Sequence, residues 1–283
     1  MLLEINKKHV TFRQIDKNTY CFNYNGSKYY LTTGTYRRIV LLKSPIVKLL
    51  VHDNKQVIAV YSSRYQYIDN SMLDDIVETV VPEHWLLDAK FSSKLVYYAR
   101  YVVPDIEVKG NNKLLFVVSN VNDGSTALRV YYGVYVLKCS NGLLSEEIAL
   151  ALRKIHIGSE FDLRTALQDI VSKYQQYAEK IERHVRISVR ESFYIEDVKR
   201  FLKVLLRKRI LTGLWHNSVL LELYRKKKDY FTAFEIANAI TNLHTRFKEL
   251  YDKPLRLLRL ERIAGKIVAN PSYVYHVINK GVI

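Results

Sequence analysis

Cysteine, proline and long apolar runs are scarce in this chain of 283 residues. Its only cysteines, Cys21 and Cys139, lack the spacing of metal ligands, so we expect free thiols in a reducing cytosol rather than a disulfide framework or a zinc site. No stretch approaches the roughly 18 uncharged apolar residues of a membrane span, and early charges interrupt any signal peptide. These absences predict a cytoplasmic protein with no membrane partner.

The sequence also lacks the motifs that mark common catalytic and cofactor sites. It contains no glycine-rich phosphate loop, no dinucleotide fingerprint and no His-Glu-x-x-His pair. Its eight histidines are scattered along the chain. We therefore predict no cofactor and no catalytic residues, and we expect that the protein is not an enzyme.

Acidic residues are outnumbered by basic ones. The chain has 44 Lys and Arg against 28 Asp and Glu, and residues 180–262 alone hold 20 basic against 10 acidic residues. A basic surface attracts polyanions, because neutralising phosphates releases counterions. We predict nucleic acid as the partner; the alternative is a soluble protein whose lysine-rich surface has no polyanionic partner.

The first third of the chain consists of short runs rich in Tyr, Val, Thr and Ile, which are typical of strands. Asn25-Gly26 separates two of these runs and tolerates the positive φ angles of a type I′ turn, so we predict a hairpin over 19–33. A helix is expected over 71–81. Residues 95–139 then contain three extended runs that end in Gly or Asn clusters, and they predict a three-stranded antiparallel meander.

After this meander the apolar residues recur with the spacing of an α-helix. Helices are expected at 159–186 and 192–212, and Thr232 and Glu235 have the spacing of a capping box that starts another helix. The predicted fold class is α+β, with a β-rich first half and an α-helical second half. We place the β-rich region at 1–142 and the helical region at 143–283, packed on it as one continuous unit.

One strand of the meander has a basic and aromatic face. In a regular strand Arg129, Tyr131 and Tyr135 share one side, and valines occupy the other. If this face is exposed, bases can stack on the rings while the cation holds the phosphate backbone. In the alternative, both faces are buried and the tyrosine hydroxyls reach a neighbouring strand.

The segment "EDVKRFLKVLLRKRI" predicts an amphipathic helix with a cationic face. Its apolar stripe is formed by Val198, Phe201, Leu202 and Leu205. The cations outside the stripe, which we propose as phosphate contacts, are Lys199, Arg200, Lys203, Arg207 and Lys208. The alternative is an ordinary solvated helix face.

A third pattern, "VPDIEVKG", places Asp105, Glu107 and Lys109 along one strand face. Such an acidic-x-Lys arrangement resembles part of a metal-dependent nuclease site. The site would need a further carboxylate, for which Asp88 and Glu83 are candidates. It is the alternative metal site and the basis of the enzyme alternative.

Three segments that span most of the chain carry a family resemblance: "VIAVYSSRYQYIDN" (57–70), "SNVNDGSTALRVYYGVYVLKCSNG" (119–142) and "TAFEIANAIT" (232–241). They resemble segments of the phage- and plasmid-like proteins of domain-of-unknown-function family 932. The resemblance implies a setting in viruses, prophages and plasmids but no activity. It points to Arg64, Tyr65, Asn70, Asn122, Asp123, Gly124, Ser125, Cys139, Asn141, Gly142, Asn238 and Thr241. The family commonly has an Arg just before Cys-Ser-Asn-Gly, and here Lys138 takes that place.

These patterns lead to one functional prediction. We expect a nucleic-acid-binding protein of a virus or other mobile genetic element that binds or anneals single-stranded DNA as a homo-oligomer, in the host cytoplasm if viral. A meander followed by a helix is also similar to the core of single-strand annealing proteins. The alternatives are a metal-dependent nuclease and a protein-interaction factor that counters host defence. The predicted nucleic-acid-binding residues are Arg64, Tyr65, Arg129, Tyr131, Tyr135, Lys138, Lys199, Arg200, Lys203, Arg207 and Lys208.

Overall fold

The fold is described from a computed structural model of the chain. The structure describes residues 1–63, 67–122, 128–136, 141–144, 163–243, 247 and 254–282. It is an α+β protein whose first half is β-rich and whose helices lie mostly in the second half, as predicted. Within the described residues, every helix is too short or too polar to cross a membrane.

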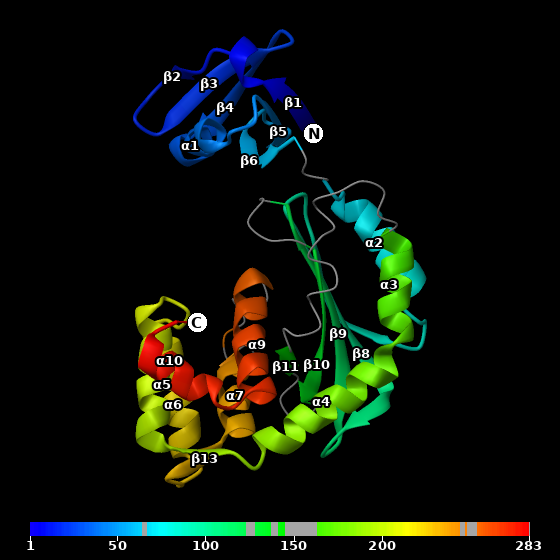
Figure 1. The fold of residues 1–283 in the computed structure, drawn as a ribbon, viewed down its shortest axis with the longest axis vertical. Helices are drawn as coiled ribbons and strands as arrows, with labels where there is room; N and C mark the ends of the chain where they lie inside the picture. Colours follow the sequence, from blue (N-terminus) through cyan, green and yellow to red (C-terminus); the bar gives the residue numbers. More distant parts are fainter. Residues whose placement is uncertain are drawn as a thin grey trace.

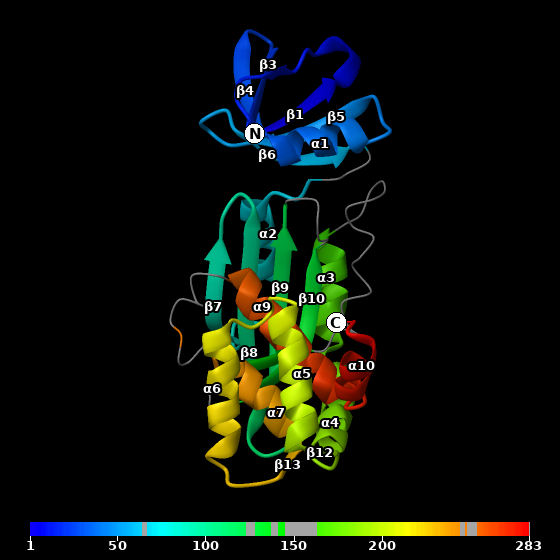
Figure 2. The same cartoon turned by 90° about the vertical axis from the view of Figure 1, so that its left-hand side faces the viewer.

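The first 62 residues form a small β-rich unit, here called the N-terminal module (Figures 1 and 2). It contains two three-stranded antiparallel sheets, in the orders β1-β5-β6 and β2-β3-β4. Between them lies a core in which Phe22, Leu31 and Leu49 are at most 1% exposed. The elements are β1 (Leu2–Asn6), the 3-10 turn η1 (Lys7–His9), β2 (Arg13–Gln14), β3 (Thr19–Tyr24), β4 (Ser27–Thr32), α1 (Thr33–Leu41), β5 (Ile46–Val51) and β6 (Val57–Ser62).

The predicted hairpin over 19–33 is confirmed as β3 and β4. Its turn residues Asn25 and Gly26 have φ angles of 46° and 73°, the left-handed region that a type I′ turn requires. A helix, α1, follows directly and was not predicted. Its N-cap is Thr32, whose hydroxyl accepts a hydrogen bond from the Thr35 N–H at 3.2 Å.

The predicted meander is confirmed, and it is the centre of a larger sheet. Five antiparallel strands are ordered β11-β10-β9-β8-β7, so one further strand lies at each edge of the meander. The tight β8–β9 turn has Gly110 at φ 74°. The strands are β7 (Leu86–Ser92), β8 (Val96–Val108), β9 (Asn112–Val121), β10 (Arg129–Val136) and β11 (Asn141–Leu144).

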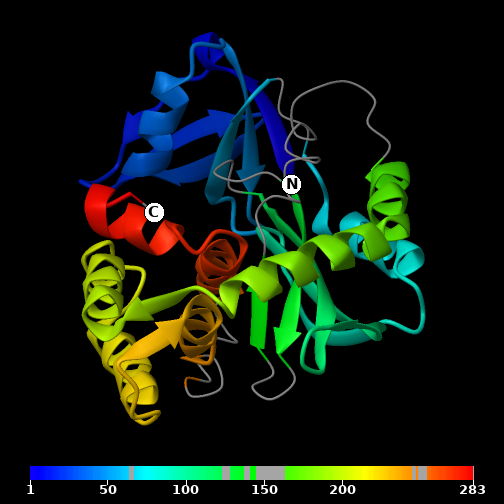
Figure 3. The ribbon, with the colours of Figure 1, turned by 60° about the horizontal axis from the view of Figure 1, so that its bottom comes forward.

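Helices cover both faces of this sheet (Figures 2 and 3). One face packs against α2 (Asn70–Val80), α3 (Leu163–Ser172) and α4 (Tyr174–Ser188), and the other against α9 (Pro254–Ala269). On the first face the Tyr132 hydroxyl donates to the Ile170 carbonyl on α3 at 3.1 Å. Because both faces are covered, the side chains of the central strands are almost all buried.

Two glycines lie where α9 packs closely on β11. A Cβ atom on Gly265 would lie 1.4 Å from the Leu144 carbonyl oxygen, and one on Gly142 would lie 2.7 Å from the Glu261 carboxylate. At Gly265 the close atoms are backbone and leave no room for a side chain, whereas at Gly142 the side chains of Leu115 and Glu261 would have to shift. The glycine of the Cys-Ser-Asn-Gly segment therefore has a packing role, because it seats α9 on the sheet.

A buried ion-pair network also joins α9 to the sheet. Arg100 on β8 donates from Nη1 to Glu261 Oε1 at 2.6 Å and forms an ion pair with Asp88 on β7. The Tyr98 hydroxyl donates to the same glutamate at 3.2 Å, and the Tyr135 hydroxyl to Asp88 at 2.9 Å. Complete burial raises the pKa of the Glu261 carboxyl above its ordinary value, although Arg100 favours the ionised form. The network ties chain segments that are distant in sequence.

The remaining helices form a bundle beside the sheet (Figure 1). A two-stranded ribbon of β12 and β13 precedes α5 and α7, and the predicted capping box of Thr232 and Glu235 starts α7. The helix expected at 159–186 is interrupted at Lys173, and the one expected at 192–212 begins three residues late because 192–194 pair as β12. The elements are β12 (Ser192–Tyr194), α5 (Ile195–Arg207), α6 (Gly213–Tyr224), β13 (Tyr230–Thr232), α7 (Ala233–Thr241) and α10 (Tyr273–Lys280).

The hydrophobic cores divide the chain near residue 63. One large cluster lies inside the N-terminal module, and another extends from Ile68 to Val277 through the sheet and the helices. The helices therefore share a core with the five-stranded sheet on both sides of residue 142. A small cluster at the junction packs Leu50, Ala59 and Tyr61 of the module against Tyr67 and Leu95. The Tyr61 hydroxyl of the module donates to the Asn122 carbonyl at the end of β9, and Lys94 pairs with Asp53 across the same junction.

Candidate nucleic-acid interface

Helix α5 is amphipathic in the way that the sequence predicts. All four residues of the apolar stripe, Val198, Phe201, Leu202 and Leu205, are fully buried. The opposite face carries Lys199, Lys203 and Arg207 at successive i, i+4 positions. Residues with this spacing lie one above another, so the three cations form a row along a helix about 20 Å long.

The cations of this face differ in how far local carboxylates neutralise them. Lys199 donates a hydrogen bond to Glu196 at 2.6 Å, and this bond holds the pKa of the Lys199 ammonium above its ordinary value. Arg200 Nη1 lies 3.6 Å from Asp197 Oδ1. Both acidic partners belong to the first turn of α5. Lys203, Arg207 and Lys208 are exposed, and no ion pair of the described residues involves them. The C-terminal half of the row is therefore the more strongly positive half.

The turn after α5 adds a further cation in an unusual backbone conformation. The Ile210 N–H donates to the Leu205 carbonyl and the Arg209 N–H to the Leu206 carbonyl, each at 3.0 Å. These two bonds define a Schellman motif, in which the residue at the Arg209 position adopts the left-handed conformation and is usually glycine. Arg209 has a φ of 55° and its side chain is exposed.

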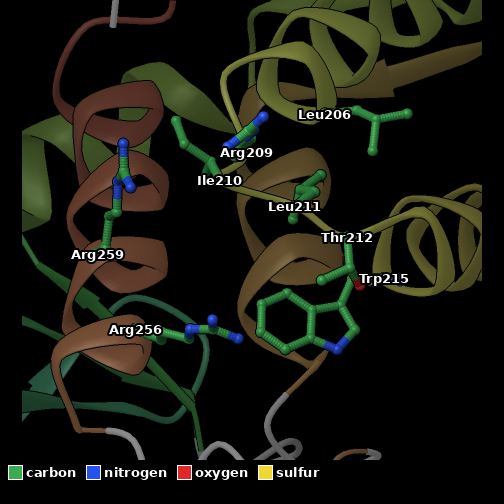
Figure 4. A pocket seen from close by; sticks show the side chains of 8 residues that line it. All are labelled: Leu206, Arg209, Ile210, Leu211, Thr212, Trp215, Arg256 and Arg259. Atoms are coloured by element: carbon green, nitrogen blue, oxygen red, sulfur yellow. Dashed lines mark hydrogen bonds between the residues drawn. The ribbon is translucent and has the colours of Figure 1, made fainter. Parts of the chain in front are cut away.

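Arg209 lines a pocket between the α5–α6 turn and α9 (Figure 4). The pocket encloses about 450 Å³ and is also lined by Thr212, Trp215, Arg256 and Arg259. Figure 4 shows that Arg256 extends from α9 toward the Trp215 ring on α6, and its guanidinium carbon lies 5.9 Å from the ring centroid. Among the described residues that line the pocket, none is acidic. We call this the arginine pocket.

Exposed tyrosines lie at the other end of α5. Tyr194 and Tyr230 face each other across the β12–β13 pair, with ring centroids 5.4 Å apart, and are 44% and 62% exposed. Tyr224, at the end of α6, is 47% exposed, and its ring centroid lies 5.4 Å from the Lys199 ammonium. Neither these rings nor the arginine pocket was predicted from the sequence. The β12–β13 pairing, which brings the rings together, joins segments on either side of a helical hairpin.

The Arg-Tyr face of β10 is not an exposed stacking surface, and that prediction is wrong for both tyrosines. Tyr131 is 0% and Tyr135 8% exposed, because α9 and the rest of the sheet cover this face. The Tyr135 hydroxyl reaches Asp88 on another strand, which is the buried alternative. Arg129 is half-buried, with Nη1 3.4 Å from the Tyr131 hydroxyl. These rings cannot stack on a base in this structure.

The predicted acidic-x-Lys triplet is not assembled as a metal site. Asp105 Oδ2 lies 3.1 Å from His84 Nε2, whereas Glu107 Oε1 lies 3.6 Å from Lys113 Nζ. Lys109 follows β8 in the turn, at φ 22°, and so leaves the strand face. Of the further candidates, Asp88 is bound to Arg100. Within the described part of the chain, no group of three or more His, Cys, Asp or Glu could hold a metal ion.

Several predicted positions lie outside the described residues, namely Arg64, Tyr65 and Lys138, with Asp123, Gly124, Ser125 and Cys139 of the family pattern. Two other family positions meet in the structure. The Asn122 side chain donates to Asn70 Oδ1 at 3.3 Å and to the Ile68 carbonyl at 2.8 Å, and Asn120 donates to the same Asn70 oxygen. These buried asparagines join the start of α2 to the end of β9.

Comparison with known proteins adds no assignment. No protein-family model, no curated protein and no solved structure matches this chain. The resemblance to family 932 stays a prediction from the three sequence segments.

Proposed function

We propose that the protein binds nucleic acid through the outer face of α5 and the adjoining α5–α6 turn. The observation that carries this proposal is the gathering of exposed cations without carboxylate partners among the described residues: Lys203, Arg207, Lys208 and Arg209. Such a row suits a phosphate backbone, because each cation can neutralise one phosphate and release a counterion. The concentration of basic residues in 180–262 supports the same surface.

Single-stranded DNA is the proposed form of the ligand. Binders of single strands combine a cationic track for the backbone with aromatic rings on which bases stack. Here the cationic row of α5 leads toward the exposed rings of Tyr194, Tyr224 and Tyr230. These tyrosines take the stacking role that the sequence had suggested for Tyr131 and Tyr135.

The biological setting and the assembly state extend this proposal. The resemblance to family 932 supports a role in replication or recombination of a virus or plasmid, and annealing of strands by a homo-oligomer is the corresponding activity. The nuclease alternative gains no support from the separated positions of Asp105, Glu107 and Lys109. No observation favours the host-protein alternative.

The test is fluorescence anisotropy with labelled single-stranded and double-stranded oligonucleotides of equal length, with and without Mg²⁺, followed by gel analysis of the DNA. We expect tighter binding of the single strand, weakening with salt, and intact DNA. Mg²⁺-dependent cleavage would restore the nuclease alternative. No binding at low salt would refute the proposal and favour a protein partner.

A further inference from the structure

We propose that the arginine pocket binds a phosphate monoester, the doubly charged group found at the end of a nucleic-acid strand and on free mononucleotides. Binding of a strand end rests on the proposed function, whereas binding of a free mononucleotide does not. The pocket adjoins the α5 row and shares Arg209 with it, but its other cations, Arg256 and Arg259, come from the first turns of α9, and the start of α6 completes it.

The lining of the arginine pocket is positively charged. Arg209, Arg256 and Arg259 come from two segments that are distant in sequence, and all three residues line one cavity. Within the described residues, no ion pair involves any of the three. Guanidinium groups bind phosphate oxygens in bidentate fashion, so three arginines around one cavity suit a doubly charged anion.

The arginine pocket also has the size of a small-ligand site. A cavity of about 450 Å³ falls in the range of small-ligand sites and is larger than a phosphate ion needs. Buried Trp215 forms an apolar wall, and Arg256 is held over its ring. A recess of this kind suits a chain end or a nucleotide better than the continuous backbone that an open helix face can follow.

The backbone at Arg209 is in the left-handed region. A left-handed residue at the end of a Schellman motif is normally glycine, because other residues are strained there. An arginine at φ 55° therefore carries a conformational cost that its backbone role does not require. The same conformation occurs at the exposed Lys227, so what sets Arg209 apart is its place at the pocket.

This strain yields a variant that separates binding from folding. Arg209→Gly is expected to leave the melting temperature unchanged or raise it by up to about 3 °C, because it relieves the strained φ. The same variant removes one guanidinium and is expected to weaken binding of a phosphate monoester at least about tenfold. If Arg209 has only a structural role, Arg209→Gly will keep or raise the melting temperature without weakening binding of the monoester.

Lys227 provides the matched control. It is also an exposed cation in the left-handed region, at φ 51°, and lies beyond the far end of α6 from the pocket. Lys227→Gly therefore makes the same change of charge and backbone. It is expected to keep full affinity for the monoester. Arg259→Gln, which removes a second lining guanidinium without any backbone change, should weaken binding as Arg209→Gly does.

The experiment measures binding of a 5′-phosphorylated oligonucleotide, a 3′-phosphorylated one, the same strand with hydroxyl ends, and a free deoxynucleoside monophosphate. A preference for one phosphorylated end that is lost in Arg209→Gly and Arg259→Gln supports a strand-end site. Binding of the monophosphate that is lost in the same variants supports a nucleotide site. The proposal is overturned if no probe shows a phosphate preference, or if the preference survives in both variants. Binding of the hydroxyl-ended strand tests the proposed function separately.

Discussion

The guanidinium group of Arg256 on α9 lies over the indole ring of Trp215 on α6, 5.9 Å from its centroid. Trp215 is buried, whereas Arg256 is exposed. The contact joins the two walls of the arginine pocket. It fixes one cation at the pocket while leaving its N–H groups available to an anion.

Arg256→Gln should therefore have a small effect on stability. An exposed cation–π contact contributes about 0.5–1 kcal/mol, so the free energy of unfolding should fall by no more than that amount. Urea denaturation followed by circular dichroism measures it. A loss above about 2 kcal/mol would show that Arg256 has a structural role that the pocket assignment does not include.

The buried network should be far more sensitive. Glu261→Leu leaves Arg100 in the sheet without its α9 partner, and breaking one side of a buried pair costs about 3–5 kcal/mol. The double variant Arg100→Met/Glu261→Leu should be destabilised by less than the sum of the two single variants. Additive losses in urea denaturation would contradict a direct pairing between β8 and α9.

Gly265→Ala is expected to prevent the close approach of α9 to β11. Its Cβ would lie 1.4 Å from the Leu144 carbonyl oxygen, so backbone must move, and we expect a loss of at least about 3 kcal/mol. Gly213→Ala is the control, because no atom lies within 4 Å of its added Cβ. Equal melting temperatures for the two variants would refute the proposed contact.

The capping box of α7 predicts a pH-dependent contribution to stability. Burial alone would raise the pKa of the Glu235 carboxyl, but hydrogen bonds from Thr232 and Lys228 outweigh it and the pKa is lowered. Because the folded-state pKa is depressed, this stabilisation is complete above the ordinary glutamate pKa of about 4.3 and is lost as the pH falls through the folded-state value.

Glu235→Gln should accordingly lower stability by about 1 kcal/mol at pH 7. The difference from the unsubstituted protein should stay constant between pH 6 and 8 and shrink below about pH 4. Denaturation midpoints across this pH range measure the difference. A gap that persists at pH 3 would show that the carboxylate charge is not what stabilises the helix start.

The exposed tyrosines should contribute to single-strand binding. Stacking of one base on one ring is worth about 1–3 kcal/mol, so Tyr230→Ala should weaken binding of a single-stranded oligonucleotide at least about fivefold. Tyr30→Ala is the control, because it removes a ring that is 39% exposed on the N-terminal module, and it should leave affinity unchanged. Equal losses for the two variants would contradict a stacking role specific to the tyrosines beside α5.

Much of the fold could be predicted because local chemistry decides it. Asn25-Gly26 specifies its hairpin turn, and the three meander strands are long and rich in valine and tyrosine. Strand β7 was missed because an exposed edge strand has no burial pattern, and β11 because its four residues begin with a turn-like Asn-Gly. Helix α1 contains Thr, Ile and Val, so its composition favours a strand and only packing in the N-terminal module overrides it.

Only the part of the candidate site that lies within one continuous segment could be predicted from the sequence. The row on α5 follows from helical periodicity and one charged segment. The arginine pocket requires α9 to meet the α5–α6 turn, which no spacing in the sequence indicates. Alternation in β10 correctly places Tyr131 and Tyr135 on one face, but whether that face is exposed depends on α9, far along the chain.

The salt dependence of single-stranded DNA binding shows whether the α5 row contacts phosphates. The variant Lys203→Gln/Lys208→Gln/Arg207→Gln is compared with a control that removes three exposed cations of the N-terminal module, Arg13→Gln/Lys17→Gln/Lys43→Gln. If the α5 row contacts phosphates, the first variant should lower the slope of log affinity against log salt by about 2, and the control should change it little. Equal slopes for both variants would mean that net charge alone attracts the DNA, and would contradict the account.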